Sequence, residues 1–471
     1  MAKVMLDGRG TPSMRERRAE AKLPGLYEFG VGWGVVLIAL SIVWPRYGFY
    51  ALGGLPQFTP FTLMAILSWA LLPALIFLNH SAREQFFTSL RSTYILLSFL
   101  GAWICWRLVA SAFGEDPAES LVLTAQAIVY LLPVLFMGLL VSNAVDGNVL
   151  IVRTVLISAI VVLGLAVLES AIKRPVVDIL GLRFATDAQA AMNATEISIR
   201  GGSMRYKSVF YHPIVFGQFL AFVFPLALWS LIQERLLLMR LLALTVILMT
   251  PWAVGITGSR AAILGLAVAA FSFAVIYAVH RSKKGAYGGV LIMIFVALTS
   301  IAAFGLLSGQ ILDLFLGRNT SEVSSSLYRS AMFSRGFDEI AYSPLSGFGD
   351  GRSPYHAGFA AGPNIVTIDS LYLSTLLDNG WIGLVLFLAV WITYFWSAFV
   401  KILAGKRLDV AGAFLAGTLS LFSIFSILSI ADNITLLFVA IVASYTRLEL
   451  EGRKIASRSY LGSGLIARRA R

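Results

Sequence analysis

The sequence predicts an all-α integral membrane protein, a helical bundle of about twelve membrane-spanning helices with two long loops on one side. Three observations predict this class. Only 13% of the 471 residues are charged and 58% are hydrophobic, whereas soluble globular chains carry about 25% charged residues. Apolar runs of about 20 residues, the length that crosses a bilayer, recur along the chain. Basic residues gather in alternate connections between these runs, a pattern typical of membrane insertion.

Each predicted span is an apolar run long enough to cross the bilayer as a helix. The spans are residues 27–44, 60–79, 93–113, 120–142, 149–169, 213–233, 239–256, 260–279, 289–308, 380–400, 411–430 and 432–446. The last two also fit a single hairpin broken at Asp432. The first run is too long for a signal-peptide core and lacks a small-residue cleavage site, so we expect it to remain in the mature protein.

The charges of the connections orient the bundle. The amino-terminal segment (1–26), four alternate connections and the carboxyl-terminal tail (447–471) are basic, so the positive-inside rule puts both termini in the cytoplasm. The net charge of +12 then reflects orientation rather than nucleic-acid binding, because the basic residues are dispersed between the spans of a transmembrane domain at 27–446. The basic residues are Lys3, Arg9, Arg15, Arg17, Arg18, Lys22, Arg83, Arg91, Arg235, Arg240, Arg281, Lys283, Lys284, Lys401, Lys406, Arg407, Arg453, Lys454 and Arg468, and an acidic outer connection holds Glu115, Asp116 and Glu119.

Two long segments, residues 170–212 and 309–379, fall on the outer side by the same count. Long loops between short connections commonly carry function, so we expect the functional site there. Their cationic residues together suggest an anionic ligand, although solvated loop surface explains any single one equally well. They are Lys173, Arg174, Arg183, Arg200, Arg205 and Lys207 in the first loop and Arg318, Arg329, Arg335 and Arg352 in the second.

A very short outer connection, Thr257-Gly258-Ser259-Arg260, leads directly into an apolar helix. Arg260 therefore stands at the outer mouth of a helix amino terminus. Its guanidinium and the backbone N–H groups of the first turn both favour an anion such as phosphate. The alternative is an arginine whose side chain extends to the lipid headgroups.

The second outer loop predicts an amphipathic helix, then a turn region, then a short helix that begins near Asp369 before Gly380 opens the tenth span. Asp369 has two interpretations. It could cap the short helix, because aspartate is a preferred N-cap residue, or it could be a carboxylate placed at the membrane surface to accept a proton. The amphipathic helix rests on Leu327, Ala331, Phe333 and Phe337, and the turn on Pro344, Gly347 and Gly349.

Metal and cofactor chemistry receive no support from the sequence. The single cysteine, Cys105, lies inside an apolar run, so neither a disulfide framework nor a cysteine metal site is expected. No D-x-D pair, H-E-x-x-H motif or Walker-type loop occurs. We expect no metal and no cofactor.

Four passages between about residues 200 and 400 carry a resemblance to a known family. They are RYKSVFYHPIVFGQFLAFVFPLAL, TGSRAAILGLAV, the stretch from Arg329 to the Pro-Leu-x-Gly-x-Gly turn that ends at Gly349, and DSLYLSTLLDNGWIGL. In their order and spacing, and in the number of spans, they resemble the O-antigen ligase and polysaccharide polymerase superfamily of bacterial envelope enzymes.

The resemblance implies glycosyl transfer at the periplasmic face of the bacterial inner membrane, in which a glycan carried on undecaprenyl diphosphate moves to an acceptor hydroxyl. It implies that Arg260, Arg205 and Arg329 bind the lipid diphosphate, with the role of Arg329 less defined. Further site candidates are Lys207, His356 and Tyr372. The implied partners are the lipid-linked glycan, membrane lipids, and chain-length regulator and export proteins, with no nucleic acid.

Position 369 separates two branches of the family. Ligase members usually present a histidine followed by Asn or Ser ahead of a tyrosine-leucine pair, and Asp369-Ser370 stands in that place. Aspartate there is similar to polymerase-like members, so we favour polymerisation of an O-antigen or exopolysaccharide, with Asp369 as catalytic base in a metal-independent, inverting transfer. Transfer of the glycan to lipid A core is the alternative. His356 lies in the same loop but lacks the motif around it.

Two hypotheses come from other classes of membrane protein. A lipid-linked glycan transporter would concentrate ionisable residues and broken helices near mid-membrane, where the sequence offers Arg107, Gln126 and Gln218 and no visible repeat. A structural or assembly protein would not require the outer-loop arginines. Substitution of Arg260 distinguishes these hypotheses from an enzyme.

Overall fold

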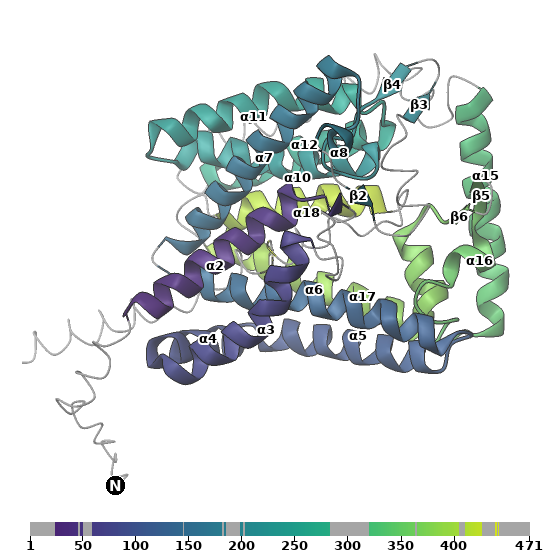
Figure 1. Ribbon diagram of the computed structural model, residues 1–471, viewed down its shortest axis with the longest axis horizontal. Helices are drawn as coiled ribbons and strands as arrows, with labels where there is room; N and C mark the ends of the chain where they lie inside the picture. Colours follow the sequence, from purple (N-terminus) through teal and green to yellow (C-terminus); the bar gives the residue numbers. More distant parts are fainter. Residues whose placement is uncertain are drawn as a thin grey trace, which may run out of the picture.

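The computed structural model describes residues 24–45, 48–49, 59–144, 146–180, 183–184, 198–200, 203–282, 320–362, 365–404, 410–425, 439 and 441. Within these ranges the chain is a bundle of helices that run side by side (Figure 1). Nine described helices are long and apolar enough to cross a membrane. They are α2 (Pro24–Val43), α3 (Pro60–Leu78), α5 (Tyr94–Ala112), α6 (Pro117–Asn143), α7 (Gly147–Ile172), α10 (Pro213–Gln233), α11 (Leu237–Ile256), α12 (Arg260–Ser282) and α17 (Leu371–Ala404).

The predicted fold class, a polytopic helical membrane protein, is confirmed. The nine helices coincide with the first eight predicted spans and the tenth. The eleventh span overlaps a shorter apolar helix, α18 (Val410–Phe425). The spans predicted at 289–308 and 432–446 lie outside the described residues.

The core of the bundle surrounds α10, which packs against α7, α11, α12 and α18. Within its apolar stretch 78% of the residues are buried, against 56% or fewer in the other described spans. Two glycines permit the close packing, because a Cβ on Gly217 would lie 2.2 Å from the Cβ of Ala262 and one on Gly417 would lie 2.6 Å from the carbonyl oxygen of Phe222. Small residues at such crossings let helices approach in lipid, where apolar surface alone drives no association.

Shorter elements connect the spans. A polar helix, α4 (His80–Ser92), follows α3 directly and is capped by Asn79, whose Oδ1 accepts the N–H of Ala82 at 3.0 Å. Among the described residues, three antiparallel strand pairs join segments outside the spans. They are β1 (Gly48–Phe49) with β2 (Arg183–Phe184), β3 (Ser198–Arg200) with β4 (Ser203–Arg205), and β5 (Phe359–Gly362) with β6 (Ile365–Thr367).

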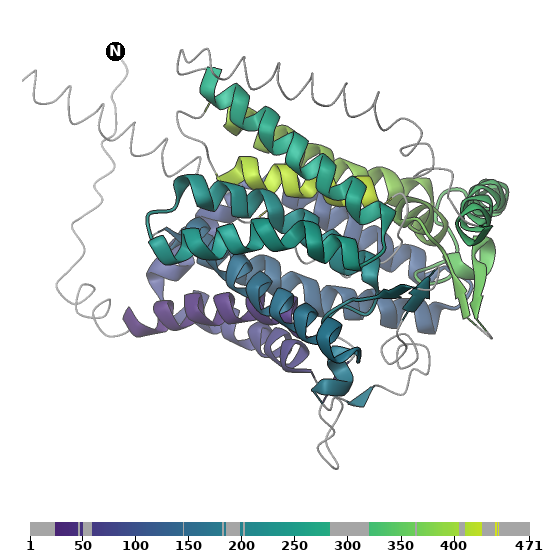
Figure 2. The same ribbon diagram turned by 90° about the horizontal axis from the view of Figure 1, so that it is seen from above.

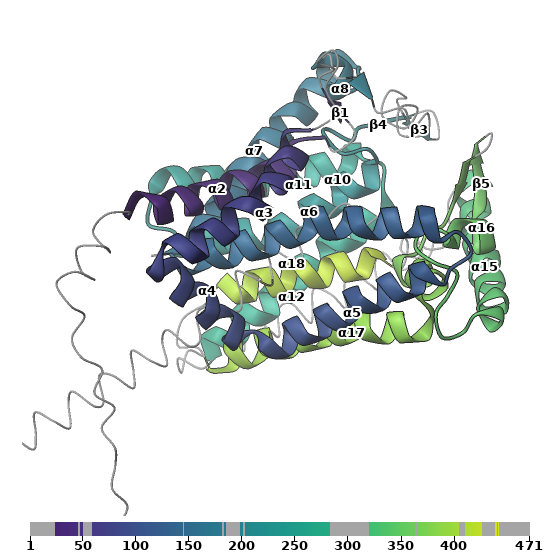
Figure 3. The same ribbon diagram turned by 60° about the horizontal axis from the view of Figure 1, so that its bottom comes forward.

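Both long outer segments gather at one end of the bundle, which we call the outer end (Figures 1 and 3). The second segment contains α15 (Thr320–Glu339), the 3-10 helix η1 (Ile340–Tyr342) and α16 (Ser353–Ala357), and the first contains α8 (Val176–Ile179). Helix α15 lies across the direction of the bundle and is seen end-on in Figure 2. This grouping agrees with the loop charges, and the assignment of the outer end to the periplasm stays a prediction.

One span is discontinuous. Gly380 interrupts α17 with φ 68° and ψ −174°, which separates a half-helix, Leu371–Asn379, from the long remainder. A positive φ of this kind suits glycine alone among the common residues. A Cβ at Gly380 would also lie 2.1 Å from the carbonyl oxygen of Leu345, so the second outer segment packs directly against the break.

Candidate functional site

The turn between α11 and α12 receives the end of the first outer segment. Arg205 is buried, and its Nε donates a hydrogen bond to the carbonyl oxygen of Thr257 at 2.7 Å. The N–H of Tyr206 donates to the carbonyl oxygen of Ile256 at 3.1 Å. The aliphatic part of Arg205 lies over Gly258, where φ is +57° and a Cβ would come within 3.3 Å of Cγ. Arg205 is therefore fixed against the turn that precedes Arg260.

Arg260 is the first residue of α12, as predicted, and is half-buried. Ser259 caps the helix, because its Oγ accepts the N–H of Ala262 at 3.2 Å. The positive end of the helix dipole thus opens at the outer end beside two guanidiniums, an arrangement that favours an anion. Two of the three arginines that the resemblance assigns to a diphosphate, Arg205 and Arg260, therefore meet at this turn.

Lys207 has a different environment, since its side chain is 3% exposed. Its backbone N–H and that of Ser208 both donate to Oε2 of Glu169, at 3.0 and 2.6 Å. The Lys207 ammonium also interacts electrostatically with the Glu169 carboxylate. Glu169 therefore fastens the first outer segment to the end of α7. The sequence signal that could have indicated its role is a carboxylate at the outer end of a predicted span.

Arg329 and Asp369, placed in one site by the sequence, form an ion pair in the structure. The Nη2 of Arg329 lies 3.2 Å from Oδ2 of Asp369, and the two side chains are 23% and 22% exposed. Arg329 comes from α15, and Asp369 immediately precedes the first turn of α17. The backbone N–H of Asp369 donates to the Sδ of Met332 at 3.2 Å, which ties the start of α17 to α15.

The amphipathic helix predicted near residue 327 exists as α15, but its predicted face is wrong. Leu327 and Phe337 are exposed, as is Ala331. The buried face instead holds Met332, Gly336 and Ile340, and a Cβ on Gly336 would lie 2.8 Å from Leu373. The face is set by where α15 can approach the start of α17, which small size permits at Gly336, and not by the largest side chains. Phe333, also assigned to the face, is partly buried against the same cluster.

The cap of the half-helix is supplied by Ser370. Its Oγ accepts the N–H of Leu373 at 3.3 Å, and its carbonyl oxygen accepts the N–H of Ser374 at 2.9 Å. Ser370, and not Asp369, is therefore the N-cap residue of the half-helix. The Asp369 carboxylate instead pairs with Arg329 and stays partly exposed at the outer end.

Two other outer-loop residues serve as fastenings. His356 lies between Glu115 (Nε2 to Oε2, 3.0 Å) and Glu339 (Nδ1 to Oε2, 3.2 Å), and its ring stacks on Phe348. Arg352 pairs with the carboxylates of Asp116, at 3.0 Å, and Glu119. The acidic connection between α5 and α6 therefore binds the second outer segment. His356 is held among carboxylates rather than beside Asp369.

Tyr372 links α17 to α18, because its hydroxyl donates to the carbonyl oxygen of Phe422 at 2.9 Å. On the other side of the same helix end, Ile424 forms an apolar cluster with Ala261. The last turn of α18 thus touches the first turns of both α12 and α17. The first turn of α12 carries Arg260, and the first turn of α17 follows Asp369. These two turns therefore lie on opposite sides of the last turn of α18.

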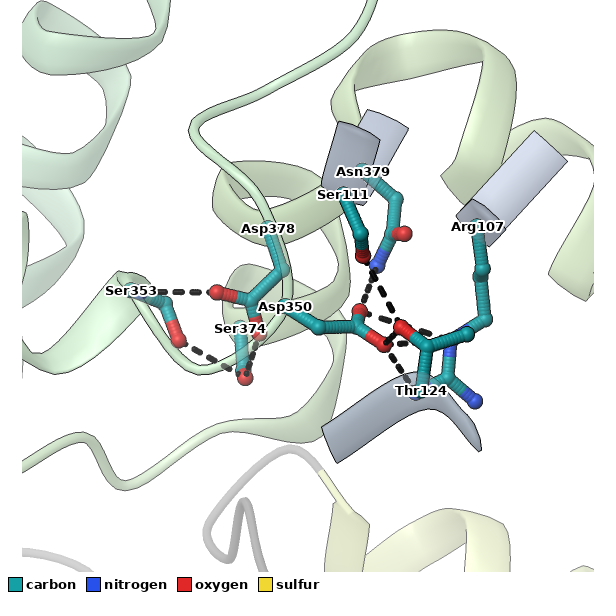
Figure 4. Close-up of polar contacts among 8 residues, drawn as sticks. All are labelled: Arg107, Ser111, Thr124, Asp350, Ser353, Ser374, Asp378 and Asn379. Atoms are coloured by element: carbon teal, nitrogen blue, oxygen red, sulfur yellow. Dashed lines mark hydrogen bonds and ion pairs between the residues drawn. The ribbon is translucent and has the colours of Figure 1, made fainter. Parts of the chain in front are cut away.

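Figure 4 shows a buried polar network behind the half-helix that sequence reasoning missed. Arg107 from α5 contacts Asp350 through Nε at 3.1 Å and Nη2 at 2.5 Å. Asp350 also accepts hydrogen bonds from Thr124 on α6 and from Nδ2 of Asn379 on α17, the latter at 3.1 Å. One carboxylate thereby joins three helices and the second outer segment. Arg107 had been considered a transporter signal.

A second carboxylate completes the network. Asp378 accepts the N–H of Ser353 at 2.7 Å and the hydroxyl of Ser374 at 3.1 Å (Figure 4). The segment that contains and follows the Pro-Leu-x-Gly-x-Gly passage therefore packs around the break at Gly380, which lies in the DNGW passage. Among the described residues no cluster of three or more His, Cys, Asp and Glu side chains suits a metal ion.

Comparison with known families was informative for the centre of the chain. Residues 243–388 match the model of a family described as O-antigen ligase. The match confirms the resemblance inferred from the four passages, and it contains Arg260, Arg329 and Asp369 while leaving Arg205 outside. No curated protein matches the chain.

Proposed function

We propose that the chain is a glycosyltransferase that polymerises oligosaccharide repeat units, carried on undecaprenyl diphosphate, into an exported O-antigen or exopolysaccharide. The premise is the match to the O-antigen ligase family, whose members are glycosyltransferase-like enzymes that act on lipid-linked glycans. The observation that carries the proposal is the pairing of Arg329 with Asp369, across the end of α18 from the helix start that holds Arg260. The reaction would take place at the periplasmic face of the bacterial inner membrane.

The donor would bind at the start of α12. Its diphosphate carries negative charge, which Arg260, Arg205 and the helix dipole can balance. When the bond between sugar and diphosphate breaks, more negative charge develops on the leaving phosphate. Guanidiniums already fixed in place stabilise that charge without reorganisation. Arg205 meets this condition because Thr257 and Gly258 hold it.

The acceptor hydroxyl needs a base, and Asp369 is the proposed one. Its carboxylate takes the hydroxyl proton while the acceptor oxygen bonds to the anomeric carbon and the diphosphate leaves with the electron pair of the broken C–O bond. General-base catalysis of this kind contributes about 10²- to 10⁴-fold in rate. Arg329 would orient the carboxylate through their ion pair. No metal takes part in this scheme.

A single displacement of this kind inverts the anomeric centre. We therefore expect the product linkage to have the configuration opposite to that of the donor sugar phosphate. Nuclear magnetic resonance of the donor and of the isolated product measures the anomeric configuration of each. A retained configuration would require a covalent glycosyl intermediate and would overturn the single-displacement scheme.

Polymerase and ligase activities differ in the acceptor. The Asp369-Ser370 pair supports the polymerase, whose acceptor is a second lipid-linked chain, and lipid A core is the ligase acceptor. The test is reconstitution with a lipid-diphosphate repeat unit. Products longer than one unit support polymerisation, whereas a single transfer to lipid A core with no elongation would establish a ligase. Chain-length regulators and export proteins are the expected partners of a polymerase.

The break in α17 is one argument for a transporter, because broken helices mark many transporter sites. The break lies at Gly380 near the outer end, however, and not at mid-membrane, and protein groups satisfy the backbone that it frees. Substitution of Arg260 by alanine separates the classes. The enzyme requires loss of glycan transfer with loss of lipid-diphosphate binding, and a variant with both intact would contradict it.

A further inference from the structure

The half-helix Leu371–Asn379 is held by its surroundings and not by the span that follows it. Gly380 has a non-helical backbone conformation inside α17, and at such a break the carbonyl groups of the preceding turn are poorly aligned with the N–H groups that follow. A buried carbonyl without a hydrogen-bond partner destabilises the folded state. Something outside α17 must therefore satisfy these groups if the half-helix is to keep one orientation.

Three consecutive carbonyl oxygens receive such donors. Those of Leu377 and Asp378 accept the backbone N–H groups of Phe348 and Gly349, at 2.8 and 2.9 Å. That of Asn379 accepts Nε1 of Trp106 on α5 at 2.9 Å. The turn at 347–353 and the outer part of α5 thus form a socket for the base of the half-helix.

Asp350 locks this socket. It lies in the turn, is 4% exposed, and bonds Arg107 on α5 and Thr124 on α6. Its remaining link is to Nδ2 of Asn379, at the base of the half-helix. The Asp350 carboxylate is thus held by α5 and α6 and in turn holds Asn379. Through these charge-assisted hydrogen bonds the bundle fixes the position of the half-helix.

The other end of the half-helix carries the proposed base. Ser370 caps its first turn, and Asp369 precedes that cap. Because a helix of nine residues is rigid along its length of about 14 Å, a tilt at Asn379 displaces Asp369. A misplacement of about 1 Å can cost about 10²-fold in rate.

We propose that Asp350 is a positioning residue, which through Asn379 fixes the half-helix and thereby directs Asp369 toward the acceptor hydroxyl. This inference rests on the proposed function. Asp350 itself touches no substrate. Its effect is expected on turnover and not on donor binding, because Arg205 is held by Thr257 and the start of α12 by Ser259, and neither hydrogen bond involves a residue of the socket.

The primary test uses Asn379→Ala, which removes the link to the half-helix and keeps the Arg107–Asp350–Thr124 contacts. In the reconstituted full-length protein kcat should fall on the order of tenfold to a hundredfold, with KM for the lipid-diphosphate donor unchanged. Asp350→Asn should give the same split. Since Asp350→Asn leaves the Arg107 charge unbalanced and can impair folding, Asn379→Ala carries the test if that variant does not accumulate.

The Asp369→Asn background provides the decisive readout. If Asp350 acts through Asp369, Asn379→Ala should lower the residual rate by less than about twofold there, because residues that act through one another are not additive. Amide hydrogen exchange across Leu371–Asn379 should quicken in Asn379→Ala. Glu234→Gln, which breaks a buried ion pair at the opposite end of the bundle, is the matched control and should change neither kcat nor this exchange.

The outcomes separate the inference from the proposed function. Full activity of Asp369→Asn would overturn the assignment of the base, and the positioning role with it. An inactive Asp369→Asn together with wild-type kcat and exchange in Asn379→Ala would overturn the positioning role alone. Equal losses from Asn379→Ala in both backgrounds would identify a general structural effect and would also overturn it.

Discussion

Two buried arginine–carboxylate pairs lie at opposite ends of the bundle and differ in what they join. At the outer end Arg107 pairs with Asp350, which connects three helices to a long loop. At the other end Arg153 on α7 binds Glu234 in two parallel contacts of 2.9 and 2.8 Å. The Glu234 carboxylate also accepts the N–H groups of Arg235 and Leu236. That pair closes the tight connection between α10 and α11 onto α7.

Burial and ion pairing alone therefore do not identify a charged residue as functional. Both carboxylates are almost fully buried, and both guanidiniums form strong hydrogen bonds. Of the two pairs, the outer one is linked to an interrupted helix whose first turn follows the proposed base. We therefore expect the outer pair to govern turnover and the inner pair to govern stability.

We expect the largest effect on turnover from a substitution of the proposed base at the outer end. Asp369→Asn removes the proposed base and should lower the turnover of the reconstituted protein by about 10²- to 10⁴-fold, with little change in thermal stability. Glu234→Gln should leave turnover per folded molecule at the wild-type level. Comparable turnover losses in the two variants would remove the distinction between the ends.

Arg260→Ala tests whether the other helix start binds the diphosphate. A hydrogen bond to a charged group contributes about 1.5–3 kcal/mol, so the affinity for the lipid-diphosphate donor should fall about tenfold to a hundredfold. Binding of donor to detergent-solubilised protein measures it. Arg281→Ala, at the far end of the same helix, is the control, and an equal loss there would point to a general effect of charge.

The break in α17 can be tested with a pair of glycines. Gly380→Ala should cost on the order of 1–3 kcal/mol from backbone strain alone, with a further clash against Leu345, and should reduce turnover. Gly255, in α11, has nothing within 4 Å of its Cβ position, so Gly255→Ala should be neutral. Thermal unfolding and turnover measure both. A neutral Gly380→Ala would show that the break is not required.

The smallest effect concerns pH and the inner pair. The hydrogen bond from Arg153 lowers the pKa of Glu234 below its ordinary value of 4.5. A depressed carboxyl pKa contributes stability that is present above the unfolded value and is lost as pH falls through the folded value. The wild type should therefore lose stability below about pH 4.5 more steeply than Glu234→Gln. Parallel stability profiles of the two proteins in this range would contradict the assignment.

Much of the bundle followed from the sequence, because lipid imposes a simple rule of length and apolarity on each span. The sequence predicted that Arg329 and Asp369 belong to one site, but not that they form an ion pair. The socket was not foreseen, since Asp350 and Asn379 are 29 residues apart and look like ordinary turn residues. Glycines at positive φ in 347–351 decide that geometry, and backbone conformation leaves little trace in hydropathy.

The face of α15 was misjudged for a related reason. In a soluble helix the largest apolar side chains mark the buried face, but an outer segment of a membrane protein can expose Leu327 and Phe337. Helix contact there depended on Gly336, which a search for large apolar residues passes over. Arg352 was likewise counted among the cations that suggest an anionic ligand, and His356 was a further site candidate, although both side chains are bound by the acidic connection.

The interruption at Gly380 also determines how the protein fits the thickness of its bilayer. As one straight rod, the 34 residues of α17 would extend about 51 Å, well beyond a hydrocarbon layer of about 30 Å. Divided at Gly380, the remainder is about 36 Å long and spans that layer with a modest tilt. The nine residues of the half-helix then extend beyond that layer, toward the headgroup zone.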